Sequence, residues 1–557
     1  MAYDLLNKVA GKMLVWRSEP LRGGLLNDIR PQYLPEPFYS DGLNVDLDDE
    51  TEPSRRDGYV VTGNTLGALS ALTFRPSGGL DFYPSTGANR KVFMAVNGDN
   101  KIVYATSLTS AWVDTIPTVD AVIDECKMIQ AGNMVLVLRG SSAPVGSDDT
   151  GAATVSGLAA TDAPANGVDA VYLFNRIWLL VGSSQTYLYY SISVPTAAGV
   201  IGQWAEGTAT TGGRLVLAAE AGNVPVAMTP WNQQSLIVFF NRCIEEVAVD
   251  PGDPYSGSIR RIIEPYFGCS ARDSVVSVGQ ELFFQDQFGQ IRSLLQTVNA
   301  EQAGVSPDPL SRSISAIIPG RLTMSSLAKT RGVVFKNRLL FAVALDGLTE
   351  AFHVVVYNLA QKRWEGLWKL PRAVRQFMVS NIRGQGDELY YFDGTVAGSP
   401  LAATAAATKF YRFFNGAYTD DGAAIPWSFT TRALDGTVPE SNKLPEWVEF
   451  EFDADAGATI TAECQVDEDG TWQSLGDATE VFGSGGTWIT YPLTYPILPP
   501  LTSLTRALYH MPALENSGRG RFHRFRVGDG VAGKQVALRA VRYGFRVENF
   551  EMEEARS

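Results

Sequence analysis

Short apolar runs recur along the chain, and glycine, aspartate, asparagine or proline separates each run from the next. Val, Ile, Phe, Tyr and Trp dominate these runs, which is typical of β-strands. Strands are predicted at Lys91–Val96, Lys101–Thr106, Met134–Leu138, Val171–Leu173, Ile177–Val181, Tyr187–Ser191, Ser235–Phe240, Glu281–Gln285, Gly332–Phe335, Leu339–Val343, His353–Tyr357 and Glu388–Phe392. Asp-Gly pairs, which tolerate the positive φ of tight hairpins, lie at Asp346-Gly347, Asp393-Gly394, Asp421-Gly422, Asp469-Gly470 and Asp529-Gly530.

Helical periodicity is rare along the chain. We expect helices only at Asp4–Lys12, at Leu322–Lys329 and in the alanine-rich segment Leu401–Thr408. Because the predicted strands do not alternate with helices, a parallel α/β sheet is disfavoured. The sequence therefore predicts an all-β protein.

The dipeptide Asn-Arg precedes an apolar strand at Asn89-Arg90, Asn175-Arg176, Asn241-Arg242 and Asn337-Arg338. Around the last three pairs, the sequence has the pattern of a strand, a turn and a second strand. The pairs are unevenly spaced, unlike a strict repeat of constant length. We predict a degenerate six- or seven-bladed β-propeller over residues 65–424, in which each blade is a small antiparallel sheet. Two unrelated β-domains with similar turns are the alternative.

The two ends of the chain differ from this middle part. Residues 1–64 are poor in apolar runs, so we expect an extended N-terminal arm that packs on the propeller or on a neighbouring subunit. Residues 145–169 contain no aromatic residue and should form an exposed loop inserted between blades. A C-terminal β-sandwich is predicted at residues 425–557 from strand-like runs at Trp427–Thr431, Trp447–Phe452, Ala458–Val466, Trp472–Leu475, Trp488–Tyr491, Phe522–Val527 and Val536–Tyr543.

Composition narrows the range of functions. Apolar residues are 45% and charged residues 19% of the 557 residues, which excludes a disordered chain and indicates surface hidden in an assembly. The 60 acidic and 46 basic residues give a net charge of −14, which argues against a protein that grips nucleic acid through a basic face. No apolar stretch is long enough for a membrane-spanning helix, and charges occupy the N-terminus where a signal peptide needs an apolar run.

No metal site or cofactor is predicted. The acidic run Asp46–Glu52 offers oxygen ligands but lacks the spacing of an EF-hand, so a solvated acidic turn explains it better. The cysteines form no C-x-x-C pair, which favours buried thiols over disulfides or a zinc site; they are Cys126, Cys243, Cys269 and Cys464. The histidines are too sparse for a histidine-based metal site; they are His353, His510 and His523.

No catalytic residue is predicted either, and we expect a protein that is not an enzyme. Asp467–Trp472 resembles the aspartate-box turn of sialidase-like propellers, but its spacing differs, and a hairpin turn over an aromatic side chain explains it. The glycine clusters Gly212-Gly213 and Gly483–Gly486 lack the Lys-Ser/Thr that follows a P-loop. Neither a nucleophile elbow nor an H-E-x-x-H motif is present.

A basic patch near the C-terminus is the last candidate site. On a strand, Arg524 and Arg526 share one face, while Phe525 and Val527 share the other. The patch could contact DNA or an acidic partner, and an edge strand protected by charge explains it equally well. Its members are Arg519, Arg521, Phe522, His523, Arg524, Phe525 and Arg526.

The chain resembles the tail nozzle, or tail-hub, proteins of short-tailed bacteriophages, a family that includes packaged-DNA stabilisation and tubular tail proteins. The likeness spans nearly the whole chain, but Asp57 stands where the family usually has proline. It rests on Gly23-Gly24-Leu25-Leu26-Asn27-Asp28, Asp41-Gly42-Leu43-Asn44-Val45-Asp46, Arg55-Arg56-Asp57-Gly58-Tyr59, Phe174-Asn175-Arg176-Ile177-Trp178, Tyr189-Tyr190-Ser191, Trp204, Ile262–Leu294, Tyr357-Asn358 and Arg363-Trp364.

This resemblance implies a structural virion protein of the phage tail, made in the host cytoplasm, that forms a homo-hexameric ring with one propeller per subunit. It implies a position beneath the portal ring and the head-to-tail adaptor, and attachment of tail fibres, spikes or a needle. The ring would hold double-stranded DNA in the head and conduct it during ejection. An acidic bore suits this passage, because duplex DNA is densely negative and would slide rather than stick.

Two alternatives come from other functional classes. One is a carbohydrate-acting or carbohydrate-binding β-propeller, that is, a depolymerase or a lectin, which would need Arg, Glu, Asp and Tyr side chains to converge at the mouth of the propeller. The other is an intracellular scaffold that binds proteins on a propeller face.

Overall fold

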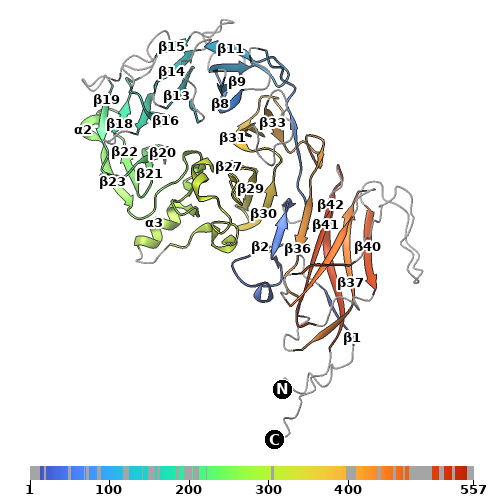
Figure 1. Ribbon diagram of the computed structural model, residues 1–557. Coiled ribbons are helices and arrows are strands. Elements are labelled where there is room, and N and C mark those ends of the chain that lie inside the picture. Colours follow the sequence, from blue (N-terminus) through green and yellow to red (C-terminus); the bar gives the residue numbers. More distant parts are fainter. Residues whose placement is uncertain are drawn as a thin grey trace. The chain divides into compact units, whose positions relative to one another are not determined.

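The computed structural model divides the chain into two compact units (Figure 1). Unit 1 contains residues 1–59, 355–369 and 415–557, and unit 2 contains residues 60–354 and 370–414. The structure describes residues 13–17, 21–47, 52–67, 69, 74–84, 90–98, 100–116, 125–140, 142–148, 157–159, 164–182, 187–193, 204, 212–220, 222–302, 307–396, 409–435, 441–455, 460–467, 471–475, 505–512, 520–529 and 533–547.

Unit 2 begins with four-stranded antiparallel sheets that follow one another in chain order (Figure 1). The first contains β8 (Arg75–Phe82), β9 (Lys91–Asn97), β10 (Lys101–Ala105) and β11 (Val113–Ile116). The second contains β12 (Lys127–Ala131), β13 (Met134–Arg139), β14 (Ser142–Asp148) and β15 (Gly157–Ala159). The third contains β16 (Gly167–Leu173), β17 (Arg176–Val181), β18 (Tyr187–Tyr190) and β19 (Gly213–Val216). The fourth contains β20 (Pro225–Trp231), β21 (Ser235–Phe240), β22 (Ile244–Ala248) and β23 (Ile259–Glu264), with the short helix α2 (Pro254–Gly257) before β23.

The rest of unit 2 continues this pattern with smaller groups. The 3₁₀ turn η2 (Arg272–Ser274) leads into a sheet of β24 (Val276–Val278), β25 (Glu281–Gln285) and β26 (Ile291–Ser293). The helix α3 (Leu294–Gln302) and the 3₁₀ turns η3 (Leu310–Ile314) and η4 (Met324–Lys329) follow. The last groups are β27 (Arg331–Phe335) with β28 (Arg338–Val343) and the start of β29 (His353–Asn358), and then β31 (Val374–Ser380), β32 (Glu388–Asp393) and β33 (Phe410–Phe413).

The first strands of these groups contact one another in chain order. Strand β8 packs beside β12, β12 beside β16, and β16 beside β20. Strand β20 then contacts η2, β24 contacts β27, and β27 contacts β31. Strand β31 in turn contacts β8, so the last group in the chain lies beside the first.

Apolar side chains fill the space between successive sheets, and the alternation of side chains along a strand explains how. In β17, Trp178 and Leu180 pack in a core with β21 and β22, while Ile177 and Leu179 pack in a core with β13. Such a strand is buried on both faces, so it reads as a continuous apolar run. Every strand predicted between Lys91 and Phe392 lies within or over a strand of the structure, and the all-β class is confirmed.

Two of the Asn-Arg pairs stand at tight hairpins, as predicted. Phe174 and Asn175 have φ values of 52° and 57°, and Lys336 and Asn337 have 47° and 60°. Two successive residues at positive φ form the type I′ turn that matches the twist of the flanking strands. The pair Asn241-Arg242 also joins two strands, but Asn89 lies outside the described residues.

Unit 1 contains two sheets that face each other. The first has the order β30 (Arg363–Lys369), β4 (Asp41–Leu43), β36 (Trp427–Thr430), β41 (His523–Asp529), β38 (Thr461–Val466) and β39 (Gln473–Ser474). The second has the order β40 (Thr505–Pro512), β37 (Lys443–Ala454), β42 (Val536–Val547), β6 (Ser54–Arg55) and β5 (Val45–Asp46), and β1 (Met13–Arg17) also pairs with β42. The ring of Phe525 in β41 lies 6.0 Å from that of Phe450 in β37 and 5.4 Å from that of Tyr543 in β42, so aromatic side chains join the two sheets.

Some expectations about local structure need revision. Residues 145–169 are not a single loop, because β14 and β15 pair within them through Val145 and Ala159, and β16 begins there. The expected helix Leu322–Lys329 is the 3₁₀ turn η4. The expected helices Asp4–Lys12 and Leu401–Thr408 lie outside the described residues. Within residues 1–64, β4, β5 and β6 are strands of the two sheets of unit 1.

Candidate functional site

The N-terminal segments that carry the family resemblance meet in a buried cluster of unit 1. Asn44, at a φ of 54°, accepts hydrogen bonds at Oδ1 from Arg56 Nε at 2.9 Å and from Lys369 N at 2.8 Å. Arg56 forms a two-pronged pair with Asp420 at 2.9 and 2.5 Å, and its guanidinium lies over the ring of Trp368 at 6.0 Å. We call Asn44, Arg56, Trp368 and Asp420 the N-terminal clasp.

The clasp is closed to solvent and sterically demanding. The side chains of Arg56 and Asp420 are 0% and 3% exposed. A Cβ on Gly58 would lie 1.8 Å from the carbonyl oxygen of Thr419, and a Cβ on Gly24 would lie 2.4 Å from that of Trp364. Both positions therefore require glycine, since real Cβ contacts are longer.

The same N-terminal segment is bound along β30, the strand that contains Arg363-Trp364. The hydroxyl of Tyr39 donates to the carbonyl of Glu365, and the indole Nε1 of Trp368 donates to Val45 O at 2.7 Å. Two separate stretches on which the resemblance rests thus form one packed structure.

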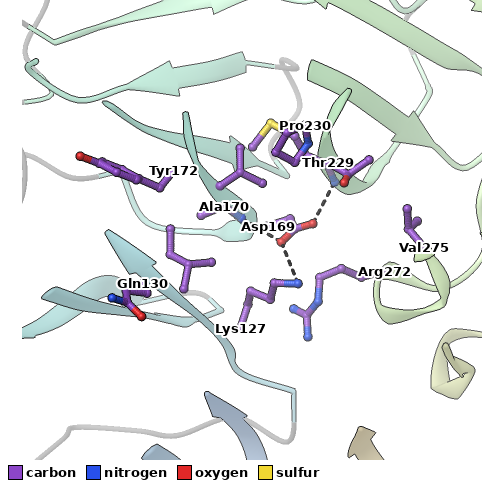
Figure 2. Close-up of a pocket in the computed structure, with 12 residues that line it drawn as sticks. Lys127, Gln130, Asp169, Ala170, Tyr172, Thr229, Pro230, Arg272 and Val275 are labelled. Atoms are coloured by element: carbon purple, nitrogen blue, oxygen red, sulfur yellow. Dashed lines mark hydrogen bonds and ion pairs between the residues drawn. The ribbon is translucent and has the colours of Figure 1, made fainter. Parts of the chain in front are cut away.

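A network of charged side chains lies in unit 2, on or beside the first strands of successive sheets. Figure 2 shows its members Lys127, Asp169 and Arg272. Lys127 Nζ of β12 lies 3.6 Å from an Asp169 oxygen of β16 and 3.8 Å from an Asp273 oxygen of η2. Arg272 pairs with Asp273 at 3.0 Å, and Arg331 Nε of β27 lies 3.7 Å from the same carboxylate.

Glu125 extends this network to a further strand. Its Oε1 accepts from Arg331 at 2.9 Å and from Arg375 of β31 at 3.2 Å. The network thus holds four cations and three anions, so it carries a surplus of one positive charge within an acidic chain. We call it the inner ion network; its members are Glu125, Lys127, Asp169, Arg272, Asp273, Arg331 and Arg375.

Neighbouring cations favour the ionised form of Asp273. Burial alone would raise the pKa of Asp273, but the cations Arg272, Arg331 and Lys127 hold it well below its usual range. Burial lowers the pKa of Arg375, and the like charge of Arg331 lowers it further. The carboxylate of Asp169 is held by the backbone amides of Ala170 at 2.9 Å and Met228 at 2.8 Å.

A hollow of about 340 Å³ opens beside Lys127, Asp169 and Arg272. Its walls include the apolar side chains of Pro230 and Val275 (Figure 2). Lys127 points toward Asp169, yet its distances to the two carboxylates are longer than a hydrogen bond. The hollow therefore offers an ammonium group with donors to spare, carboxylate acceptors beside it, and apolar walls.

Sequence reasoning missed this network. Its members come from separate sheets, and no spacing along the chain brings them together. The one available hint is a charged residue near the start of an otherwise apolar strand, as at Lys127, Arg331 and Arg375. Such a residue usually marks a solvated strand end, so the hint is weak.

The basic patch near the C-terminus lies on β41, and its interpretation as a charged edge strand is wrong. Strand β41 lies between β36 and β38, so it is an interior strand and not a charged edge. Arg524 and Arg526 share a face as predicted, and both lie over the ring of Trp472, at 5.5 and 4.5 Å. Arg526 pairs with Glu463 at 2.6 Å. Intramolecular contacts therefore occupy both arginines, while Arg519 lies outside the described residues.

The other motifs are structural where they are described. Asp467, with a φ of 46°, accepts from the amides of Arg521 and Phe522 at 2.7 and 2.8 Å. It lies directly after β38, which pairs with β39. All four cysteines are free and buried; burial raises the pKa of Cys269 and Cys464 to about 12. The middle of Asp46–Glu52, the middle of Asp467–Trp472 and all of Gly483–Gly486 lie outside the described residues.

Two further kinds of site are absent from the described part of the chain. None of its helices is long and apolar enough to cross a membrane. No group of three or more His, Cys, Asp or Glu side chains in these residues is arranged to hold a metal ion.

Comparisons with known proteins add no family to this picture. No family model matches the sequence, and no curated protein matches it. Among solved structures, the chain is similar to the computationally designed Ika8 protein, with 7% sequence identity and a TM-score of 0.35. That match covers 63% of this chain and 98% of the designed one.

Proposed function

We propose that this chain is a structural virion protein, the tail nozzle or hub of a short-tailed bacteriophage. The N-terminal clasp carries the proposal. Its members Asn44 and Arg56 come from the segments on which the resemblance rests, and the β30 segment with Trp364 packs against them. If the sequence pattern shared with the family reflects a shared fold, the residues of that pattern should contact one another, as Asn44 and Arg56 do.

The proposal includes a finer description of the fold. Unit 2 would be a seven-bladed propeller, in which β8, β12, β16, β20, β24, β27 and β31 are the innermost strands. Support comes from the contacts of these strands in chain order and from the return contact of β31 with β8. The position of β7 (Tyr59–Val61) beside β33 adds support, since an early strand in the last blade would close the ring. Unit 1 would be a β-sandwich.

The proposed role is mechanical and not catalytic. Six copies would form a ring in the virion tail, below the portal and the head-to-tail adaptor, and would carry fibres, spikes or a needle. Double-stranded DNA would pass through the ring without tight binding. The pairing of Arg526 with Glu463 supports this, because it reduces the charge that the basic patch presents to phosphate.

Negative-stain microscopy and native mass spectrometry of the purified protein test this function. We expect rings with a central opening and a mass six times that of the chain, formed alone or with the adaptor ring. We also expect no hydrolysis of capsular or cell-wall polysaccharide. A protein that stays monomeric in both settings, or a hydrolase activity lost on changing one carboxylate, would contradict the proposal.

The hollow favours a second candidate, a carbohydrate-binding propeller. A sugar hydroxyl can accept from Lys127, which lies 3.6 Å from Asp169 and so makes no hydrogen bond to that carboxylate. Calorimetric titration with mono- and oligosaccharides tests this candidate. Saccharide binding that Lys127→Met abolishes and Lys101→Met preserves would favour it, and the absence of binding to the wild type would remove it.

A further inference from the structure

An apolar surface lies on α2 and on the last strands of the third and fourth sheets of unit 2. Four large side chains there are strongly exposed: Tyr255 at 72%, Ile259 at 67%, Val216 at 58% and Ile262 at 40%. They form one surface, because α2 contacts β19 and Arg260 donates to the carbonyl of Val216. We call Val216, Tyr255, Ile259, Arg260, Arg261 and Ile262 the β23 edge.

The strand at its centre has an open side. Strand β23 is the last in the order β20-β21-β22-β23 and pairs with β22 alone among the described strands. Its first four residues are all exposed, so neither face of this half of the strand packs into a core. Natural proteins usually protect such edges with charged residues, proline or a covering segment. Here Arg260 and Arg261 give partial protection, but the exposed isoleucines on either side of them leave apolar surface at the edge.

The β23 edge carries positive charge on a chain that is negative overall. Arg260 and Arg261 are adjacent on the exposed half of the strand, and the whole chain carries a net charge of −14. Arg261 pairs with Glu246, yet its side chain remains 67% exposed. The surface is therefore apolar with a basic component on an acidic protein.

We propose that the β23 edge is the surface on which a second copy of this chain docks. Charge complementarity favours this partner: another copy is acidic on average, so it attracts the two arginines while apolar side chains become buried. Two β23 edges would not meet each other, because four arginines would then face one another. The contact is therefore heterologous, and repeated contacts of this kind close into a ring when the rotation between neighbouring copies divides a full turn. This inference rests on the proposed function and identifies one face of its subunit interface.

The test compares two variants of the full-length protein. Ile259→Asp with Ile262→Asp places charge on the proposed contact. Val113→Asp is the matched control, since Val113 is 43% exposed and lies on β11, an edge strand of another sheet of unit 2. Sedimentation velocity over a range of protein concentrations measures assembly, and circular dichroism with thermal unfolding checks that each variant is folded.

We expect the wild type and Val113→Asp to assemble equally, and the double variant to remain folded and monomeric. A double variant that forms the same rings as the wild type would overturn this inference and leave the proposed function standing. A wild type that is monomeric at every concentration would also overturn it, and recruitment to the adaptor ring would then decide the function separately. Twofold dimers that the double substitution breaks would contradict the heterologous contact.

Discussion

Arg56 shows how much one side chain organises in unit 1. It holds Asn44, Asp420 and the ring of Trp368 at once, in a site closed to water. Lysine keeps the charge but cannot reproduce the planar fork of donors. We expect Arg56→Lys to lower the free energy of unfolding by about 2–3 kcal/mol. Chemical denaturation monitored by tryptophan fluorescence measures this.

The control for this change is Arg383→Lys, which affects a pair with Glu388 that is 33% and 22% exposed. Exposed pairs contribute little, so its stability should match that of the wild type. Equal stability of both variants and the wild type would contradict the importance of the clasp.

Asp273 makes the stability of unit 2 depend on pH. Its pKa is depressed in the folded protein, so its contribution is fully present above the pKa of an unfolded aspartate, about 3.9, and is lost as the pH falls below that value. We expect Asp273→Asn to cost about 3 kcal/mol at neutral pH, because Arg272 and Arg331 lose their shared anion. The difference from the wild type should shrink as the pH falls toward 3.

Thermal unfolding across this pH range measures the effect. Asp308→Asn is the control, since Asp308 pairs with Arg312 and its side chain is 63% exposed. A constant difference between Asp273→Asn and the wild type at all pH values would show that the ion pairs do not stabilise the fold.

Hairpins are the elements that fix how each sheet of unit 2 is connected. In the β27–β28 hairpin, Asn337 has a φ of 60°, a conformation that asparagine and glycine tolerate and β-branched residues do not. We expect Asn337→Val to destabilise the protein by about 1–3 kcal/mol and Asn337→Gly to be neutral. Differential scanning calorimetry compares the two; equal transition temperatures would argue against the type I′ turn.

The strands of unit 2 were predictable, and the reason is their burial. The five-residue core of β17 reads as an apolar run because both of its faces pack on neighbouring sheets. The sheet order of unit 1 was not predictable, since β4 lies between β30 and β36, which follow it by hundreds of residues. The inner ion network could not be predicted from the sequence for the same reason. Lys127 and Arg331 both lie beside Asp273, and only tertiary contacts bring the three side chains together.

The charge balance of the whole chain determines how it should behave toward DNA. The net charge is −14, and Arg526 is already paired with Glu463. We expect no retardation of linear duplex DNA in a gel-shift assay at about 50 mM salt, where binding by counterion release is strong. Tight, salt-sensitive binding that Arg524→Glu with Arg526→Glu abolishes would show that the basic patch grips DNA and that the conduit model is wrong.

The discontinuous make-up of unit 1 has a consequence for biosynthesis. Strands β4, β5 and β6 leave the ribosome early, but their partners β36 and β42 are translated only after the whole of unit 2. Unit 2 can therefore acquire its sheets while translation continues, whereas unit 1 must wait for the last part of the message. Until β42 emerges, β6 lacks the strand that pairs with it on the side away from β5, so a nascent chain stalled before β42 would carry this edge open to chaperones or proteases.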